Sequence, residues 1–169
     1  MDVQKILVPL DYSGDSQQAL QWGASLAEKY GAMLWLLHVI PKAVEQVEPR
    51  GSGWDVVPAS FYDGMAPGRR PFVRQPIISD LVDRAQTELA DFAVKHLKAA
   101  GPIQVDVAVG TPAEEILRVA REERVDLIIM GTHGRTSWRH LLLGSVAEEV
   151  TRHAPCPVFT VRIGLEVAA

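Results

Sequence analysis

Residues 127–148, LIIMGTHGRTSWRHLLLGSVAE, join an apolar run, a glycine-containing turn and the start of a helical pattern. The run from Leu127 to Met130 is apolar at every position, which is typical of a strand covered on both faces. Gly131 follows the run, and Gly144 precedes the helical pattern. A buried strand followed by a turn and a helix is the unit from which parallel sheets are built, so the stretch predicts an α/β fold.

The rest of the chain alternates in the same way. Segments rich in β-branched residues predict five strands, at 3–9, 33–40, 103–109, 127–130 and 158–162. Helical patterns lie between them, at 13–30, at 79–100, from Pro112 and from Ser145. Gly31 and the pair Gly101-Pro102 are stop signals. Thr-x-x-Glu from Thr111 and Ser-x-x-Glu from Ser145 predict capping boxes at the last two helices.

This alternation predicts parallel pairing, right-handed crossovers and a three-layer α/β/α sandwich. The continuously apolar runs at 34–37 and 127–130 predict inner strands. Polar residues alternate with apolar ones at 103–109, which indicates a strand nearer an edge.

Composition limits the class of protein. The 169 residues, 47% of them hydrophobic and 22% charged, suit a single domain that we expect to span 1–165. A net charge of −4 provides no basic footprint for nucleic acid. No apolar run approaches the roughly 18 to 20 residues of a membrane helix, and the first residues show no signal-peptide pattern. We therefore expect a cytoplasmic protein with neither nucleic-acid nor membrane partners.

Cys156 is the only cysteine, which excludes an internal disulfide and a thiolate zinc site. We expect it to be an inert packed residue. The segment 41–76 breaks the alternation, with six of the eleven prolines and four of the thirteen glycines. Such a long insertion or loop is either disordered or simply packed, or it forms a lid or partner surface.

The glycines after the fourth strand follow the pattern Gly, two residues, Gly, nine residues, Gly-Ser, at Gly131, Gly134, Gly144 and Ser145. Glycines at the end of a strand let backbone N–H groups approach an anion, because no Cβ stands in the way. The helix that starts near Ser145 adds free N–H groups and a favourable dipole for phosphate. Ser145 either caps that helix or contacts a phosphate oxygen.

With these motifs the sequence resembles the universal stress protein family, in particular its ATP-binding branch. The marks are residues 6–11 (ILVPLD), 110–116 (GTPAEEI), the glycine pattern and residues 152–158 (RHAPCPV). The resemblance implies an adenine nucleotide alpha hydrolase-like fold with five parallel strands in the order 3-2-1-4-5. In that order a crevice opens between the carboxyl ends of strands one and four, where Asp11 and Gly131 face each other.

The resemblance also implies a site for ATP and Mg²⁺. Val39 matches a position near the adenine, Pro9 and Met130 match positions beside the base and ribose, and Asp11 matches the carboxylate near the ribose and the metal-bound phosphates. The remaining matches are ribose-phosphate and triphosphate contacts, at Gly131, His133, Gly134, Gly144, Ser145 and Val146. Asp11 alone could serve the metal, since Mg²⁺ bound to phosphates keeps several waters.

Several of these residues have a structural alternative. Asp11 could only cap the first helix, and His133 could be a solvent-facing loop residue. Arg135 and Arg139 either screen phosphates or are ordinary surface arginines, and His38 is expected to be a packed, hydrogen-bonded residue.

Three residues depart from the family pattern. Ser137 stands where relatives commonly have glycine, Trp138 stands where a smaller apolar residue is usual, and Tyr12 stands where many have glycine after the aspartate.

No P-loop, dinucleotide-binding or Gly-x-Ser-x-Gly motif occurs. We expect a nucleotide-responsive regulatory module in the stress response that hydrolyses ATP slowly or not at all, because tight ground-state binding does not accelerate a reaction. A nucleotide-free dimeric interaction protein and an ATP-hydrolysing enzyme are the alternatives. An unpaired apolar edge at Val158–Val161, through which family members commonly dimerise, predicts a homodimer. The sequence does not identify a protein partner.

Overall fold

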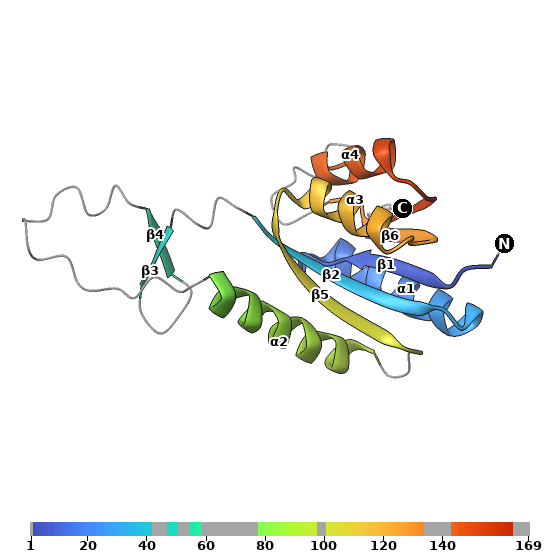
Figure 1. Cartoon of the computed structure of the whole chain (residues 1–169), viewed down its shortest axis with the longest axis horizontal. Helices are drawn as coiled ribbons and strands as arrows, with labels where there is room; N and C mark the ends of the chain where they lie inside the picture. The colour runs from blue at the N-terminus through green and yellow to red at the C-terminus, as the bar shows by residue number, and fades with distance from the viewer. Residues whose placement is uncertain are drawn as a thin grey trace, which may run out of the picture.

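The computed structural model describes residues 2–41, 47–50, 55–58, 78–97, 101–133 and 143–163. Its main sheet has the strand order β5-β2-β1-β6-β7, and every neighbouring pair is parallel (Figure 1). The strands of this sheet and the helices are β1 (Lys5–Pro9), α1 (Gly14–Tyr30), β2 (Met33–Pro41), α2 (Ile78–His96), β5 (Ile103–Gly110), α3 (Pro112–Glu122), β6 (Leu127–Gly131), α4 (Ser145–His153) and β7 (Val158–Val161). The expected order 3-2-1-4-5 is confirmed, with β2 and β6 inside and β5 and β7 at the edges.

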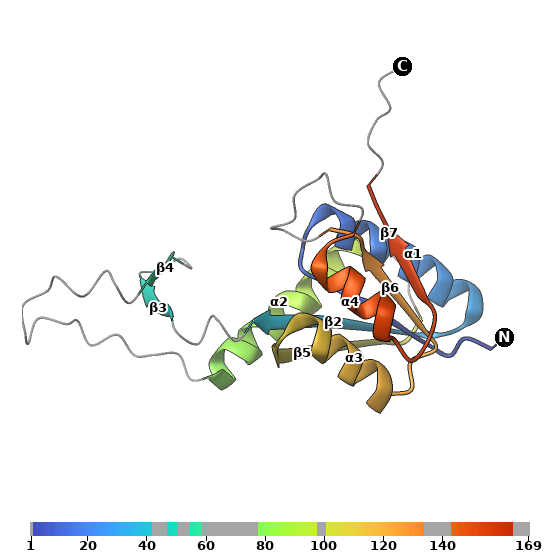
Figure 2. The ribbon, with the colours of Figure 1, turned by 90° about the horizontal axis from the view of Figure 1, so that it is seen from above.

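Helices cover both faces of the sheet. Because successive side chains of a strand point to opposite faces, Ile6 and Val8 of β1 pack with α1 and α2, whereas Leu7 packs with α3 and α4. Figure 1 shows α3 and α4 above the sheet and α2 below it, and Figure 2 shows the same layers from above. The predicted three-layer α/β/α architecture is thus confirmed.

The ends of α1 follow the sequence signals. Ser13 is the N-cap, and its side chain accepts a hydrogen bond from the Ser16 N–H. Gly31 is the C-cap in the left-handed conformation, with φ of 65°, which glycine adopts without a steric penalty. Helix α2 ends at His96, earlier than the predicted residue 100, and residues 98–100 lie outside the described part.

The two expected capping boxes do not form. Thr111 is the N-cap of α3, with proline next to it as predicted, but its side chain makes no capping hydrogen bond. The N-cap of α4 is Gly144 rather than Ser145, and no side chain caps that helix. The Gly144 N–H donates to the Thr132 carbonyl at 2.7 Å, which holds Gly144 extended, so that the first helical residue is Ser145.

Two short strands lie within the segment 41–76, where no regular structure was expected. Residues Val47–Arg50 (β3) pair antiparallel with Asp55–Pro58 (β4) in a sheet of their own. Prolines at 49 and 58 obscure the strand pattern in the sequence, yet an edge position needs no N–H donor. The remaining residues between 42 and 77 lie outside the described part.

The sheet opens between β1 and β6. Their ladder joins only Ile6 with Leu127 and Leu7 with Ile128, although β1 stays paired with β2 as far as Pro9. The two strands therefore separate towards their carboxyl ends. This is also where the strand order reverses, and open α/β sheets bind ligands at such a point.

Candidate functional site

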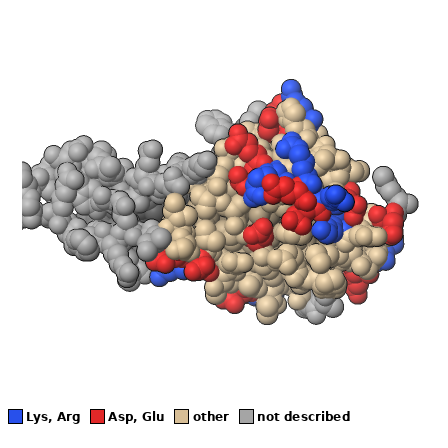
Figure 3. All heavy atoms as spheres, in the orientation of Figure 1, with Lys and Arg blue, Asp and Glu red and all other residues tan. Residues whose placement is uncertain are grey.

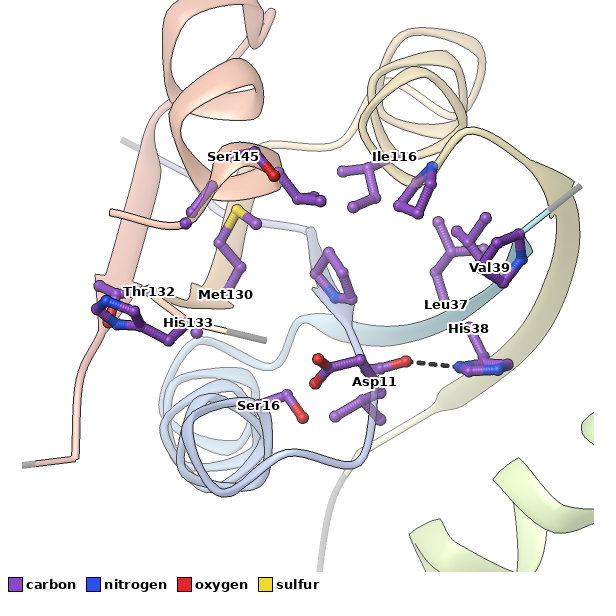
Figure 4. A pocket seen from close by; sticks show the side chains of 18 residues that line it. Asp11, Ser16, Leu37, His38, Val39, Ile116, Met130, Thr132, His133 and Ser145 are labelled. Carbon is purple, nitrogen blue, oxygen red and sulfur yellow. Dashed lines mark hydrogen bonds between the residues drawn. The ribbon is translucent and has the colours of Figure 1, made fainter. Parts of the chain in front are cut away.

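A cavity of about 370 Å³ lies at the carboxyl ends of the strands, where β1 and β6 diverge (Figure 4). This volume is within the usual range for small-molecule sites. Its lining comes from β1, α1, β2, α3, β6 and α4 and from the residues that follow the strands. It consists of Pro9, Leu10, Asp11, Ser16, Leu37, His38, Val39, Pro41, Pro112, Ile116, Met130, Gly131, Thr132, His133, Gly144, Ser145, Val146 and Ala147.

The structure brings nine of the ten predicted site residues together around this cavity. They are Pro9, Asp11, Val39, Met130, Gly131, His133, Gly144, Ser145 and Val146. Gly134 lies outside the described residues, as do Arg135, Ser137, Trp138 and Arg139. Their proximity agrees with the predicted crevice, while their role in binding stays a prediction.

The cavity has an apolar side and a polar side. Figure 4 shows Leu37, Val39 and Ile116 around one part of the cavity and Ser145, at the start of α4, at another. Met130 lies near Ser145 in Figure 4, and Pro9 also lines the cavity. A ligand with a flat apolar group and an anionic tail matches this division, because each part would meet surroundings of its own kind.

The start of α4 supplies donors to the polar side. Its first turn consists of Ser145, Val146 and Ala147, all of which line the cavity. N–H groups in the first turn of a helix have no acceptor within the helix, and the helix dipole favours an anion there. Since Gly144 is the N-cap, the Ser145 hydroxyl has no capping role in this helix.

Asp11 lines the cavity and lies near His38 in Figure 4. Its Oδ1 accepts hydrogen bonds from the Ser13 N–H at 3.0 Å and from the Ser13 hydroxyl at 2.5 Å. The N-cap of α1 is Ser13, so the alternative in which Asp11 caps that helix is wrong. The two Ser13 bonds orient the carboxylate, which is the only acidic side chain among the described lining residues.

Gly131 has a structural reason to be glycine besides any ligand. A Cβ there would lie 2.8 Å from the Asp15 Cβ and 2.9 Å from the Ser16 nitrogen. The first turn of α1 therefore packs directly on the backbone at the end of β6. Gly131 thus permits the close approach of α1 to β6.

Asp15 is a residue that the sequence analysis did not assign to the site. Its Oδ2 accepts hydrogen bonds from the Thr132 hydroxyl at 3.0 Å and from the His133 N–H at 3.1 Å. The solvent-facing alternative for His133 is wrong, because only 12% of its side chain is exposed. In Figure 4 its ring lies beside Thr132 at one edge of the site.

His38 is half-buried, and its Nδ1–H donates to the Leu10 carbonyl at 2.7 Å, as Figure 4 shows. The expectation of a hydrogen-bonded residue holds, but His38 also lines the cavity. Tyr12 packs on it, with ring centroids 5.0 Å apart, and on Phe92 of α2 at 5.2 Å.

Tyr12 has φ of 63°, in the left-handed region. The conformation costs a non-glycine residue roughly 1–2 kcal/mol, which accounts physically for the glycine expected at this position. Its ring contacts with His38 and Phe92 offset part of that cost.

We expect Tyr12→Phe to stabilise the protein by about 1 kcal/mol at pH 7, because the Tyr12 hydroxyl is buried and makes no hydrogen bond with a described residue. Burial raises the pKa of this hydroxyl, and the negative charge of Glu88 raises it further. The native state therefore holds the proton more tightly than the unfolded chain, and stability falls as pH rises above about 10.

Urea unfolding of both proteins between pH 7 and pH 11 measures these effects. The stability advantage of Tyr12→Phe should widen above pH 10, because the variant has no phenol to ionise. A constant difference across this range would contradict the burial argument.

Other features of the described residues limit the chemistry. Burial raises the pKa of the Cys156 thiol, with Asp126 adding to the effect, which supports an inert role. No group of three or more His, Cys, Asp or Glu side chains in the described part could hold a metal ion alone. Among the described helices, none is long and apolar enough to span a bilayer.

Charges of both signs are interspersed on the face shown in Figure 3. On α3, Arg118 donates to Glu115 at 2.9 Å and also to Glu122. Nearby, the Lys5 amino group lies 3.5 Å from the Glu123 carboxylate. Such neighbouring pairs leave little excess charge at this surface.

The chain is similar to known proteins. The sequence model of the universal stress protein family matches residues 2–162. Universal stress protein MJ0577 of Methanocaldococcus jannaschii is 32% identical over 163 residues, which cover 94% of each chain. A solved structure of the hypothetical protein MJ0577 has a TM-score of 0.72 and 26% identity, and the match covers 98% of this chain and 100% of that chain.

Two further solved structures share the fold. A universal stress protein in complex with cAMP has a TM-score of 0.61 and 20% identity, with 97% of this chain and 100% of that chain covered. The Archaeoglobus fulgidus universal stress protein in complex with dAMP has a TM-score of 0.59 and 18% identity, with 95% and 99% covered. On the family match and the identity to MJ0577, this chain belongs to the universal stress protein family.

Proposed function

We propose that this protein binds an adenine nucleotide, ATP with Mg²⁺, and acts as a nucleotide-responsive regulatory module in the stress response. The observation that carries the proposal is the division of the cavity into an apolar slot by Val39 and Ile116 and a polar end at the start of α4. The slot suits a purine, and the helix start suits a phosphate chain. The relatives solved with cAMP and with dAMP support an adenine nucleotide.

Asp11 is the proposed residue for Mg²⁺. The described part offers no cluster that would hold a metal by protein groups alone, so the donor set suits an ion bound mainly by phosphate oxygens and water. One oriented carboxylate in the cavity lining fits that requirement. Mg²⁺ bound there would neutralise part of the phosphate charge.

We expect slow or absent hydrolysis. The described titratable side chains in the cavity lining are Asp11, His38 and His133. Asp11 is the residue proposed for Mg²⁺, and tight ground-state binding of ATP does not by itself accelerate its hydrolysis. Single-turnover assays should show no hydrolysis at ordinary enzymatic rates; rapid turnover that Asp11→Ala abolishes would favour the enzyme alternative.

The proposal is tested by denaturing freshly purified protein, identifying any released nucleotide by mass, and titrating nucleotide-free protein with ATP. We expect adenine nucleotide in the first experiment and saturable binding in the second. Absence of both would favour the nucleotide-free interaction protein.

We expect Asp11→Asn to weaken ATP binding about tenfold in the presence of Mg²⁺, because the variant loses the anionic ligand of the ion. With EDTA in place of Mg²⁺, Asp11→Asn should bind ATP more tightly than the wild type, because removing a carboxylate next to a polyanion relieves repulsion. Calorimetric titration under both conditions measures this crossing.

Asp91→Asn is the matched control for Asp11→Asn. It changes the net charge by the same amount at an exposed position on α2. It should change ATP affinity under neither condition. An Asp11→Asn variant that weakens ATP binding equally with and without Mg²⁺ would argue against a metal role.

We also propose a homodimer that forms through Val158–Val161 of β7. This strand is an edge of the sheet, and Phe159 is 41% exposed beside Trp22, which is 46% exposed. Their rings meet edge to face at 5.7 Å. An apolar sheet edge of this kind favours pairing with a second copy. Sedimentation velocity should give twice the chain mass of 18.5 kDa.

A further inference from the structure

The Asp15 carboxylate joins three segments that are distant in the sequence. Besides Thr132 and His133 on Oδ2, its Oδ1 accepts a hydrogen bond from the Ile163 N–H at 3.2 Å. Only 13% of the Asp15 side chain is exposed, and Asp15 is not among the residues that line the cavity. The carboxylate thus connects the start of α1 to the end of β6 and to the residues after β7.

These bonds also orient His133. The Thr132 hydroxyl has one hydrogen, which it donates to Asp15, because a carboxylate can only accept. The contact of 2.9 Å between Thr132 Oγ1 and His133 Nδ1 therefore requires Nδ1–H to be the donor. The His133 ring therefore donates to the Thr132 hydroxyl, and the Thr132 hydroxyl donates to the Asp15 carboxylate.

Thr132 also connects this hydrogen-bonded group to the start of α4. Its carbonyl accepts the hydrogen bond from the Gly144 N–H at 2.7 Å, and its own N–H donates to the Val161 carbonyl at 2.9 Å. Gly144 is the N-cap of α4. The distance between the first turns of α1 and α4 is consequently set through Asp15 and Thr132.

We propose that Asp15 is a positioning residue for the phosphate-binding end of the nucleotide site. This inference rests on the proposed function. Asp15 acts on the start of α4 and on His133, and none of its hydrogen bonds reaches the apolar slot beside Val39. Its effect should therefore appear only for ligands that carry phosphates.

The test compares ATP, with Mg²⁺ present, and adenosine as ligands of the wild-type protein and of Asp15→Ala. We expect Asp15→Ala to weaken ATP binding about tenfold, because two bonds to the turn are lost, and to change adenosine binding less than twofold. A general loss of structure would weaken the binding of ATP and of adenosine to the same extent.

Asp15→Asn is the rescue variant. Both bonds to the turn use Oδ2, so one amide oxygen placed there keeps them, while the amide nitrogen, which cannot accept, loses only the hydrogen bond from the Ile163 N–H. We expect Asp15→Asn to bind ATP within about twofold of the wild type, because the bonds to Thr132 and His133 are kept. Thr132→Val, which keeps the side-chain volume and removes the hydroxyl, should show the same phosphate-selective loss as Asp15→Ala.

The outcomes separate this inference from the proposed function. A wild-type protein that binds neither ligand would overturn the proposed function itself. If the wild type binds both, equal weakening of both ligands in Asp15→Ala and Thr132→Val, or unchanged ATP binding in those variants, would overturn the positioning role alone. ATP binding in Asp15→Asn as weak as in Asp15→Ala would also do so.

Discussion

Gly131→Ala is expected to lower the free energy of unfolding by about 2 kcal/mol, a typical cost of overpacking a close contact. The added methyl group would lie 2.8 Å from the Asp15 Cβ and 2.9 Å from the Asp15 carbonyl carbon and the Ser16 nitrogen. Two of these three atoms belong to the backbone of α1, so no side-chain rotation relieves the clash. Urea unfolding at pH 7 measures the loss.

Gly101→Ala is the matched control for Gly131→Ala. Among the described residues, a Cβ at Gly101 would contact only the Ala32 carbonyl oxygen, at an ordinary distance of 3.5 Å. This substitution should change stability by less than about 0.5 kcal/mol. Equal effects of the two substitutions would mean that α1 does not press on β6 as described.

Gly131→Ala should also weaken ATP binding, because any shift of α1 away from β6 moves Asp15 and with it Thr132. Folded variant protein can be titrated at low temperature to measure this. If Gly131→Ala is clearly destabilised but binds ATP as tightly as the wild type, then Gly131 matters for packing and not for the geometry of the site.

Val39→Trp is expected to reduce adenine nucleotide affinity about 100-fold, which corresponds to about 2.7 kcal/mol. Val39 lines the apolar part of the cavity near Leu37 and Ile116. An indole in that place would occupy the volume proposed for the base, whereas the phosphate-binding end would stay unchanged. The variant should therefore lose adenosine and ATP binding by similar factors, in contrast to Asp15→Ala.

Val94→Trp serves as the control for the same substitution, since Val94 lies on α2 with 81% of its surface exposed. It should bind both ligands like the wild type. Thermal unfolding of Val39→Trp verifies that it is folded. A folded Val39→Trp protein with unchanged affinity would place the base elsewhere than in this slot.

Much of the fold could be predicted because it depends on local patterns. The apolar run at 34–37 marked β2 as an inner strand, and the alternation at 103–109 marked β5 as an edge strand. Gly31 ended α1 as expected because its left-handed conformation is a local requirement. The strand order came from the family resemblance, since periodicity does not say which strands are neighbours.

The capping boxes show where a local pattern fails. Ser145 has the right residue type and spacing for an N-cap, but the bond from Gly144 to Thr132 shifts the helix start by one residue. Asp15 was missed for a related reason. In the sequence it is an ordinary acidic residue in the first turn of a helix. The described residues that donate hydrogen bonds to it all lie more than 100 residues away, at Thr132, His133 and Ile163.

The amino-acid sequence by itself determined the alternation of strands and helices, the inner and edge character of β2 and β5, and the glycine spacing after β6. Only the tertiary structure decided that β1 and β6 diverge around a cavity, that Ser13 rather than Asp11 caps α1, and that Asp15 supports the turn after β6. Periodicity and turn preferences are properties of neighbouring residues, whereas a cavity and its supporting bonds arise where residues far apart in the chain are packed together.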